Sequence, residues 1–166
     1  MNFSSAGILF EDTGGDKSHY LSGWNPKLKA WSGFGGKRRG DETAWQTALR
    51  EVVEELFGLR IKKDDLHSLY QKLTPFEFFQ NDSYVCFICP LRTVFEISAY
   101  LEGFGYKSPF YIKFPITLDE LLVSRNCETV KFPEITDLQL ISLPFEQPLD
   151  PYFVSDLDYI QKKNTF

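Results

Sequence analysis

Three glutamates stand close together in one short segment of the chain, at positions 51, 54 and 55. Apolar residues recur at helical spacing from Thr43 to Phe57, which predicts an amphipathic helix. On this helix Glu51 and Glu55 share a face, and Glu54 lies at its edge. Oxygen clusters of this kind hold hard divalent cations such as Mg²⁺. A solvated acidic face is the competing interpretation, and the helix taken alone favours it.

The loop before the helix favours a metal- and phosphate-binding site over a solvated acidic face. Gly35 and Gly36 allow the backbone to turn sharply and to approach a ligand closely. They lead into a helix start, whose free N–H groups suit phosphate. The basic residues Lys37 and Arg39 beside this loop are further candidates for phosphate contact, although a solvated basic patch explains them equally well.

Loop and helix together resemble the Nudix box, Gx5Ex7REUxEExGU, where U is a bulky aliphatic residue. The positions that match in register are Gly36, Glu42, Arg50, Glu51, Val52, Glu54 and Glu55. Six fixed positions would match by chance in about one of 10⁵ chains of this length. The elements on both sides of the box suit the fold that this resemblance implies, an α/β/α sandwich with a mixed sheet.

Two positions depart from the family pattern. Leu56 and Phe57 both precede Gly58, so the helix is one residue longer before the glycine, which we expect to end it in a left-handed conformation. Phe34 stands where the family often has proline. An added residue rotates the helix exit by about 100°. We therefore expect changes in the substrate pocket rather than in metal binding.

The resemblance also implies roles for the residues of the box. Glu51, Glu54 and Glu55 would ligate Mg²⁺ or Mn²⁺, with Glu51 and Glu54 taking part in catalysis. Arg50 would orient a glutamate through a charge-assisted hydrogen bond. Glu42 would support the junction of loop and helix or add a metal ligand.

A general base is still required, and in the family it is either a box glutamate or an acid on a separate loop. Glu134 is our first candidate for a loop acid, because Pro133 stiffens the chain before it and a predicted core strand follows it. Glu77 is the second candidate. An exposed surface position without a catalytic role is an equally good interpretation of Glu134.

Strands are predicted on both sides of the box. Ser4–Phe10 and His19–Trp24 would form a hairpin, because a glycine-rich turn separates them. Further strands are predicted from alternating or continuous apolar residues, at Leu28–Phe34, Leu66–Leu73, Tyr84–Leu91 and Ile135–Leu143. Cys86 and Cys89 would point to opposite faces of their strand and so could not share a metal.

Two more helices are predicted from their first residues. Thr117 begins a capping-box pattern, which predicts a short helix to about Ser124. Asp150 and Pro151 supply the cap and first position of a last helix. Its inner face would carry Phe153, Val154, Leu157 and Ile160. Residues 95–114 have no pattern that assigns them.

Composition narrows the classes of function. The 166 residues suit a single domain covering 1–166. The formal charge of −5 argues against nucleic acid as a partner, since that binding depends on cationic contacts. Three cysteines argue against a disulfide scaffold, and neither a signal peptide nor a membrane-spanning run is recognisable. We expect a cytoplasmic protein without membrane contacts, and a homodimer is compatible with the sequence.

The function predicted from these features is Mg²⁺-dependent hydrolysis of the diphosphate linkage in a nucleoside diphosphate derivative. The spacing of Pro75 from the box resembles that in ADP-ribose pyrophosphatases, so an ADP-ribose-like substrate is our first choice. Capped RNA, diadenosine polyphosphates and diphosphoinositol polyphosphates remain as alternatives. A binding module without catalysis is the alternative from another class, and such modules typically lose box acids that this chain keeps.

Overall fold

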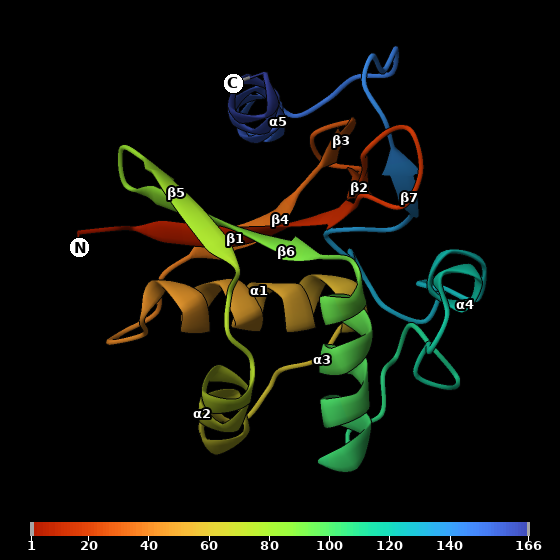
Figure 1. Ribbon diagram of the computed structural model, residues 1–166. Coiled ribbons are helices and arrows are strands. Elements are labelled where there is room, and N and C mark those ends of the chain that lie inside the picture. The colour runs from red at the N-terminus through yellow and green to blue at the C-terminus, as the bar shows by residue number, and fades with distance from the viewer. Residues whose placement is uncertain (1, 166) are drawn as a thin grey trace.

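A mixed seven-stranded sheet lies at the centre of the protein (Figure 1). The structure is a computed structural model that describes residues 2–165. The strands are β1 (Ser5–Asp12), β2 (His19–Asn25), β3 (Ala30–Ser32), β4 (Phe34–Lys37), β5 (Glu77–Asn81), β6 (Tyr84–Pro90) and β7 (Leu138–Ile141). The main path runs β3-β2-β1-β6-β5, while β4 pairs with β1 and β7 pairs with β2. Strands β1 and β6 are parallel, and the other pairs are antiparallel.

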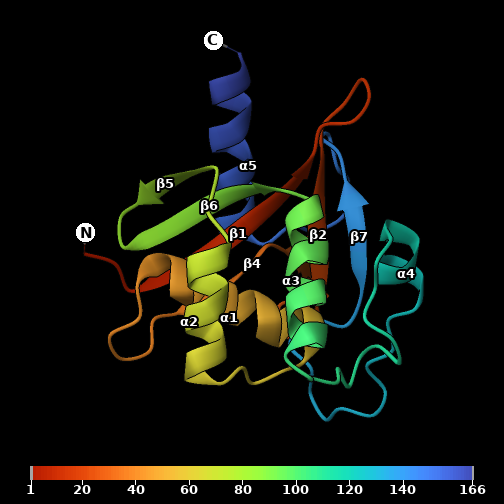
Figure 2. The same ribbon diagram turned by 60° about the horizontal axis from the view of Figure 1, so that its bottom comes forward.

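Helices cover both faces of this sheet, as Figures 1 and 2 show. They are α1 (Ala44–Phe57), α2 (Lys63–Lys72), α3 (Arg92–Gly103), α4 (Leu118–Val123) and α5 (Pro151–Asn164). Helix α1 packs directly on β1 and β4, and α2 packs against α1. Helix α5 lies on the opposite face, and α4 lies beside β7. The predicted fold class, an α/β sandwich with a mixed sheet, is confirmed.

The alternation of side chains along β1 builds two separate cores. Ile8 and Phe10 point toward α1, whereas Leu9 between them packs under α5 with Phe153. Strand β6 divides in the same way. Its Cys86 belongs to the α5 core and Cys89 to the α1 core, so the expected opposite orientation of the two cysteines is confirmed.

Helix α1 is closed at both ends by the residues that the sequence indicates. The Thr43 side chain accepts a hydrogen bond from the Gln46 N–H, and the Gln46 side chain accepts one from the Thr43 N–H, which is a complete capping box. At the other end Gly58 has φ 67°, so the predicted left-handed cap is confirmed. Its N–H donates to the Glu54 carbonyl. The two capped ends stabilise α1, the helix that carries the three box glutamates.

Two predicted strands are wrong. The segment Leu66–Leu73 lies in and just after helix α2, because its leucines at 66, 69 and 73 also fit a helical face, and Asp64 and Asp65 favour a helix start. The segment Leu28–Phe34 does not form one strand. Ala30–Ser32 pairs with β2, and the chain changes partner at Gly33 so that Phe34–Lys37 pairs with β1.

Other elements differ in extent or were not predicted. Strand β5 and helix α3 were not predicted, and α3 occupies part of the unassigned stretch. Strand β7 is shorter than the predicted Ile135–Leu143. On α5, three of the predicted inner residues are buried, but Val154 is 37% exposed because it faces away from the sheet.

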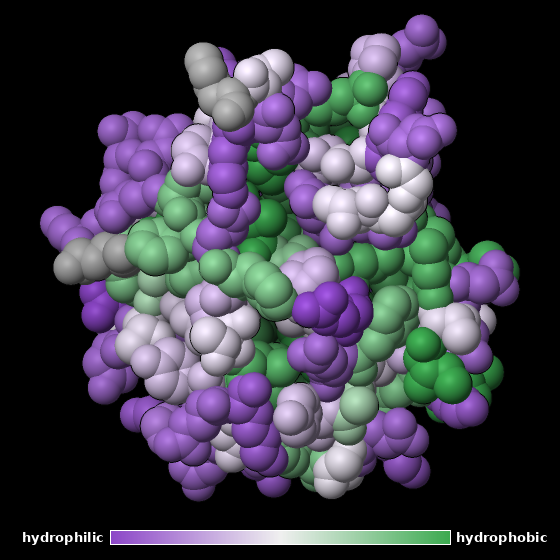
Figure 3. All heavy atoms as spheres, viewed as in Figure 1, coloured by the Kyte–Doolittle hydropathy of each residue, from purple (hydrophilic) through white to green (hydrophobic). Residues whose placement is uncertain are grey.

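The surface is mixed in polarity. Figure 3 shows apolar side chains across the middle of the face on which edge strand β5 lies, where Phe76 and Phe78 are exposed. Within residues 2–165, no helix combines the length and the apolar character that crossing a membrane demands.

Candidate active site

Arg50 organises the junction between the glycine loop and helix α1. Its Nε donates to Glu42 Oε1 at 2.6 Å, and its Nη2 donates to the Lys37 carbonyl at 2.7 Å. Glu42 also accepts hydrogen bonds from the Thr47 hydroxyl and the Arg39 N–H. Burial of the Glu42 carboxyl opposes its ionisation, but these hydrogen bonds, led by that from Arg50, lower its pKa. Both carboxylate oxygens of Glu42 thus accept hydrogen bonds at the junction of loop and helix.

The same guanidinium reaches two of the predicted metal ligands. Arg50 Nη1 donates to Glu51 Oε1 at 2.7 Å and lies 3.5 Å from Glu54 Oε2. Burial raises the pKa of Glu51, and the charges of Glu54 and Glu134 add to that effect, while Arg50 opposes it. Glu54 is more exposed and also pairs with Arg39 at 2.7 Å. The geometry thus has Arg50 orienting a box glutamate.

Glu55 is the least satisfied polar group of the site. The residue is 5% exposed, and its Oε2 is buried without a hydrogen-bond partner among the described residues. Its Oε1 accepts one long hydrogen bond from the Gly35 N–H at 3.4 Å. Burial raises the pKa of Glu55 well above its ordinary value, and the charges of Glu134, Glu51 and Glu54 raise it further. Among the described residues, the Glu55 carboxyl group thus has a single weak hydrogen bond and no positively charged partner.

Glu134 lies close enough to the box for its charge to act on it. Of the neighbouring carboxylates, Glu134 contributes most to the raised pKa of Glu55, and it also raises that of Glu51. The residue is exposed, and it precedes Ile135, which is buried in the α1 core. The charge of Glu134 thus acts on both Glu51 and Glu55.

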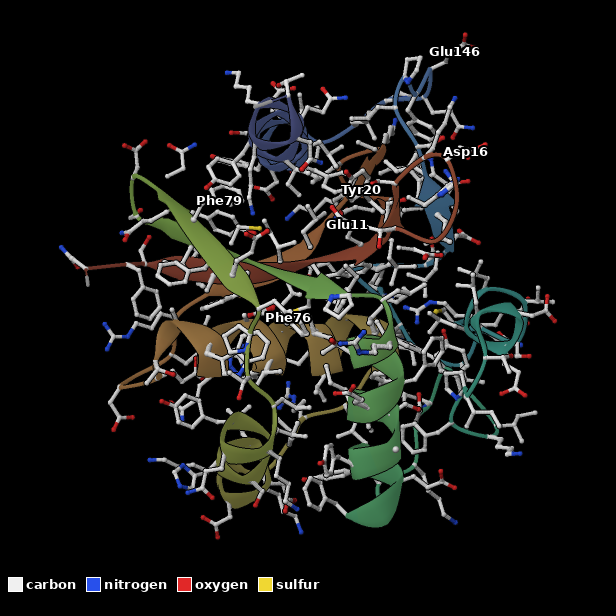
Figure 4. All side chains as sticks on the ribbon, viewed as in Figure 1. Glu11, Asp16, Tyr20, Phe76, Phe79 and Glu146 are labelled. Carbon is white, nitrogen blue, oxygen red and sulfur yellow. The ribbon has the colours of Figure 1, made fainter. Side chains whose placement is uncertain are left out.

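The second candidate for a loop acid lies elsewhere. Glu77 begins β5 and forms an ion pair with Lys163 of α5. Its charge also raises the pKa of Glu11, after burial of that residue. Figure 4 shows Tyr20 and Phe79, which pack under α5, on this side of the sheet. Since α1 covers the other face, Glu77 is remote from the box.

The donor set suits a hard divalent cation. Carboxylate oxygens are the preferred protein ligands of Mg²⁺, and Glu55 presents an unpartnered one beside Glu51. Within residues 2–165, however, no three acidic, histidine or cysteine side chains converge as a ready metal cluster. Arg50 and Arg39 hold Glu51 and Glu54 instead. A site that uses all three glutamates would require Glu54 to leave its exposed partner Arg39, which costs little.

The glycine loop borders a cavity of about 500 Å³ on the α5 side of the sheet. Its walls include Gly35, Gly36 and Lys37, together with Tyr84 and the first turns of α5. Lys37 is exposed and makes no ion pair with other described residues. Its ammonium is therefore available to an anion, whereas Arg39 already meets Glu54.

Sequence reasoning did not single out Tyr84 and Asp156, which also line this cavity. Tyr84 is half-buried and Asp156 is buried on the α5 side, and burial raises the pKa of Asp156 to about 7. Neither stands in a spacing that marks chemistry, so the sequence held no signal for them. A larger cavity, of about 950 Å³, opens beside Arg125 and α4 and does not include the box glutamates.

Comparison with known proteins supports the fold. Neither a protein-family model nor a curated protein matches the sequence. Among solved structures, the Nudix hydrolase RenU from M. smegmatis is similar over 98% of this chain and 86% of its own, with 14% identity and a TM-score of 0.53. The NUDIX domain of Shewanella oneidensis NrtR, solved with ADP ribose, is similar over 98% and 88%, with 13% identity and a TM-score of 0.50. The chain therefore has the Nudix hydrolase fold, as the resemblance in its sequence predicts.

Proposed function

We propose that this chain is a divalent-metal-dependent hydrolase that cleaves the phosphoanhydride bond of a nucleoside diphosphate derivative. The observation that carries the proposal is the buried, unpartnered Oε2 of Glu55 beside Glu51, within reach of the charge of Glu134. Burying an unpaired carboxylate is costly, so a protein keeps one where a ligand completes it. A divalent cation held by Glu55 and its neighbouring carboxylates would complete this one.

Glu51, Glu54 and Glu55 would hold Mg²⁺ or Mn²⁺. When bound, the metal would neutralise diphosphate charge and lower the pKa of an attacking water. Arg50 would keep Glu51 and Glu54 in place, since one rigid guanidinium contacts both. Glu42 would in turn fix Arg50.

Glu134 would act as the general base. Its carboxylate is exposed and makes no hydrogen bond with the described residues that would hold it back from water. In the reaction, the water oxygen bonds to one phosphorus while the bridging oxygen leaves with the other phosphate. The water proton passes to the Glu134 carboxylate and then to solvent.

An ADP-ribose-like compound is the substrate class that we favour. The glycine loop gives the diphosphate a place beside the box, and the cavity of about 500 Å³ behind Gly35 and Gly36 has the volume of a small-molecule site. The similar NUDIX domain of NrtR was solved with ADP ribose, which supports this choice of probe. Lys37, exposed at the cavity rim, would meet a phosphate.

The test is a substrate panel with Mg²⁺, read by product chromatography. It should include ADP-ribose, a diadenosine polyphosphate, capped RNA and a diphosphoinositol polyphosphate, each with and without excess chelator. We expect the protein to convert ADP-ribose to AMP and ribose phosphate when Mg²⁺ is present, and to give no product in excess chelator. Turnover that persists in chelator would contradict the metal role. Tight binding of ADP-ribose without any turnover would instead support a non-catalytic binding module.

A further inference from the structure

Arg125 connects the end of helix α1 to the loop that carries Glu134. Its Nη2 donates both to the Glu55 carbonyl at 2.8 Å and to the Ile135 carbonyl at 3.0 Å. Its Nη1 donates to the Leu56 carbonyl, and its Nε donates to the Thr136 carbonyl at 3.2 Å. One side chain thus holds two carbonyls of α1 and two carbonyls of the segment that follows Glu134.

The chemistry of this contact favours arginine in particular. The last carbonyls of a helix have no partner within the helix and carry a partial negative charge. A guanidinium is always charged and presents its donors in a rigid planar fork, so it can join two backbone segments at a fixed separation. The Phe110 ring, 4.6 Å from the guanidinium carbon, restricts it on one side.

Arg125 is an unsuitable phosphate ligand for the same reason. Its guanidinium nitrogens are all engaged with carbonyl oxygens, although the residue borders the cavity of about 950 Å³. A residue whose donors are already used serves to fix its partners. Those partners include the main chain of Glu55 and the residue directly after Glu134.

We propose that Arg125 is a positioning residue that fixes the Glu134 loop against the metal-binding end of α1. The proposal rests on the proposed function, in which Glu55 holds the metal and Glu134 accepts the proton. Because Nη2 is shared between the Glu55 and Ile135 carbonyls, this one group links the main chain of Glu55 to the residue directly after Glu134. Losing it would displace the base without removing it.

The experiment compares the wild type with Arg125→Gln, Glu134→Gln and the double variant, using ADP-ribose and Mg²⁺. We expect Arg125→Gln to lower kcat about 10²-fold, the scale of a 1 Å misplacement, with KM nearly unchanged. In the Glu134→Gln background the same change should lower kcat by less than about 3-fold, because residues that act through one another are not additive. If the falls in kcat of the two single variants multiplied in the double variant, Arg125 would act independently of Glu134, and the proposal would be overturned.

Hydrogen exchange supplies a readout that does not depend on turnover. We expect residues 133–137 to exchange about 10-fold faster in Arg125→Gln, while β1 and β6 keep their protection. Unchanged exchange in 133–137 would overturn the proposal. If the wild type cleaves no substrate of the panel, the proposed function fails, and the exchange measurement still decides whether Arg125 fixes the loop.

Two further variants guard against a loss of folding. Arg125→Lys keeps the charge but replaces the fork with a single ammonium, so it should fold and show the same pattern in milder form. Tyr106→Phe is the matched control. It removes hydrogen bonds with Asp65 and the Lys62 N–H, away from the box. Its Tm should fall about as much as that of the Arg125 variants, while its kcat should stay within about 2-fold of the wild-type value. An equal fall of kcat in Tyr106→Phe would overturn the proposal.

Discussion

The α-carbon of Gly36 faces the carboxylate of Glu51 so closely that an added Cβ would lie 2.4 Å from the Glu51 carboxyl carbon and 2.5 Å from its Oε1. No side chain fits there unless Glu51 moves. The glycine of the box is therefore required by a packing contact with the first glutamate of the helix. This contact links the loop, through Glu51, to Arg50 and the rest of the network.

Gly36→Ala should lower kcat by about 10²-fold, because it displaces a metal ligand that Arg50 otherwise holds in place. Far-UV circular dichroism should remain that of the wild type. Gly103→Ala is the matched control, since a Cβ on Gly103 meets nothing within 4 Å. Equal kcat in the two alanine variants would contradict the assigned role of this contact.

Glu55→Gln should separate stability from activity. Burial raises the pKa of Glu55, so at pH values above its ordinary pKa this carboxyl group destabilises the folded state, and replacing it with a neutral amide should raise Tm measured in chelator at pH 8. We expect Mg²⁺ to raise the Tm of the wild type, and the same change should remove that rise, because a proposed metal ligand is lost. It should lower kcat by about 10²-fold or more.

The control for this variant is Glu102→Gln, which removes an exposed carboxylate from α3. It should keep the Mg²⁺-dependent rise of Tm. A Glu55→Gln protein that Mg²⁺ stabilises as much as the wild type would show that the metal lies elsewhere.

The parts of the site that are local in sequence could be predicted. Gly36, Glu42, Arg50 and the box glutamates lie within one loop and one helix, so spacing alone brings them together. Helix α1 could be predicted for the same reason, since its caps and its apolar face agree. Arg125 could not, because its four carbonyl partners come from segments that only the tertiary fold brings near.

The errors in the fold have a common cause. Leu66, Leu69 and Leu73 suit either period over so short a run, and packing against α1 selects the helix. Strand β5 lies at the sheet edge and buries only Phe79, while its neighbour Phe78 is exposed, so the strand has no run of alternating apolar residues. Tertiary contacts, rather than local preference, decide both segments.

Glu134→Gln tests the loop acid itself. We expect kcat to fall by about 10²-fold with KM nearly unchanged, the pattern of an interaction made mainly in the transition state. Glu128→Gln, which changes another exposed acid of the same connection, should leave kcat unchanged. Wild-type turnover in Glu134→Gln would assign the base to a box glutamate.

The buried carboxyl group of Asp156 should make the free energy of unfolding depend on pH. Asp156 lies on α5 and is 6% exposed, and burial raises its pKa from 3.8 to about 7, with a hydrogen bond to Cys86 opposing the shift and the charge of Asp150 adding to it. A raised pKa means that the folded protein holds a proton that the unfolded chain releases. The contribution of Asp156 to the free energy of unfolding is therefore fully present below about pH 4, and it is lost as the pH rises to about 7.

Asp156→Asn should remove this loss. The free energy of unfolding of the variant should therefore rise relative to that of the wild type between pH 4 and 7, and it should remain higher above pH 7. The gain is at most about 4 kcal/mol, since one pKa unit corresponds to about 1.4 kcal/mol. Urea unfolding at pH 4.5 and pH 8 measures it, with Asp158→Asn as the control because Asp158 is exposed on the same helix. If the two variants gained equally between these pH values, general charge repulsion would explain the effect, and the buried carboxyl of Asp156 would not.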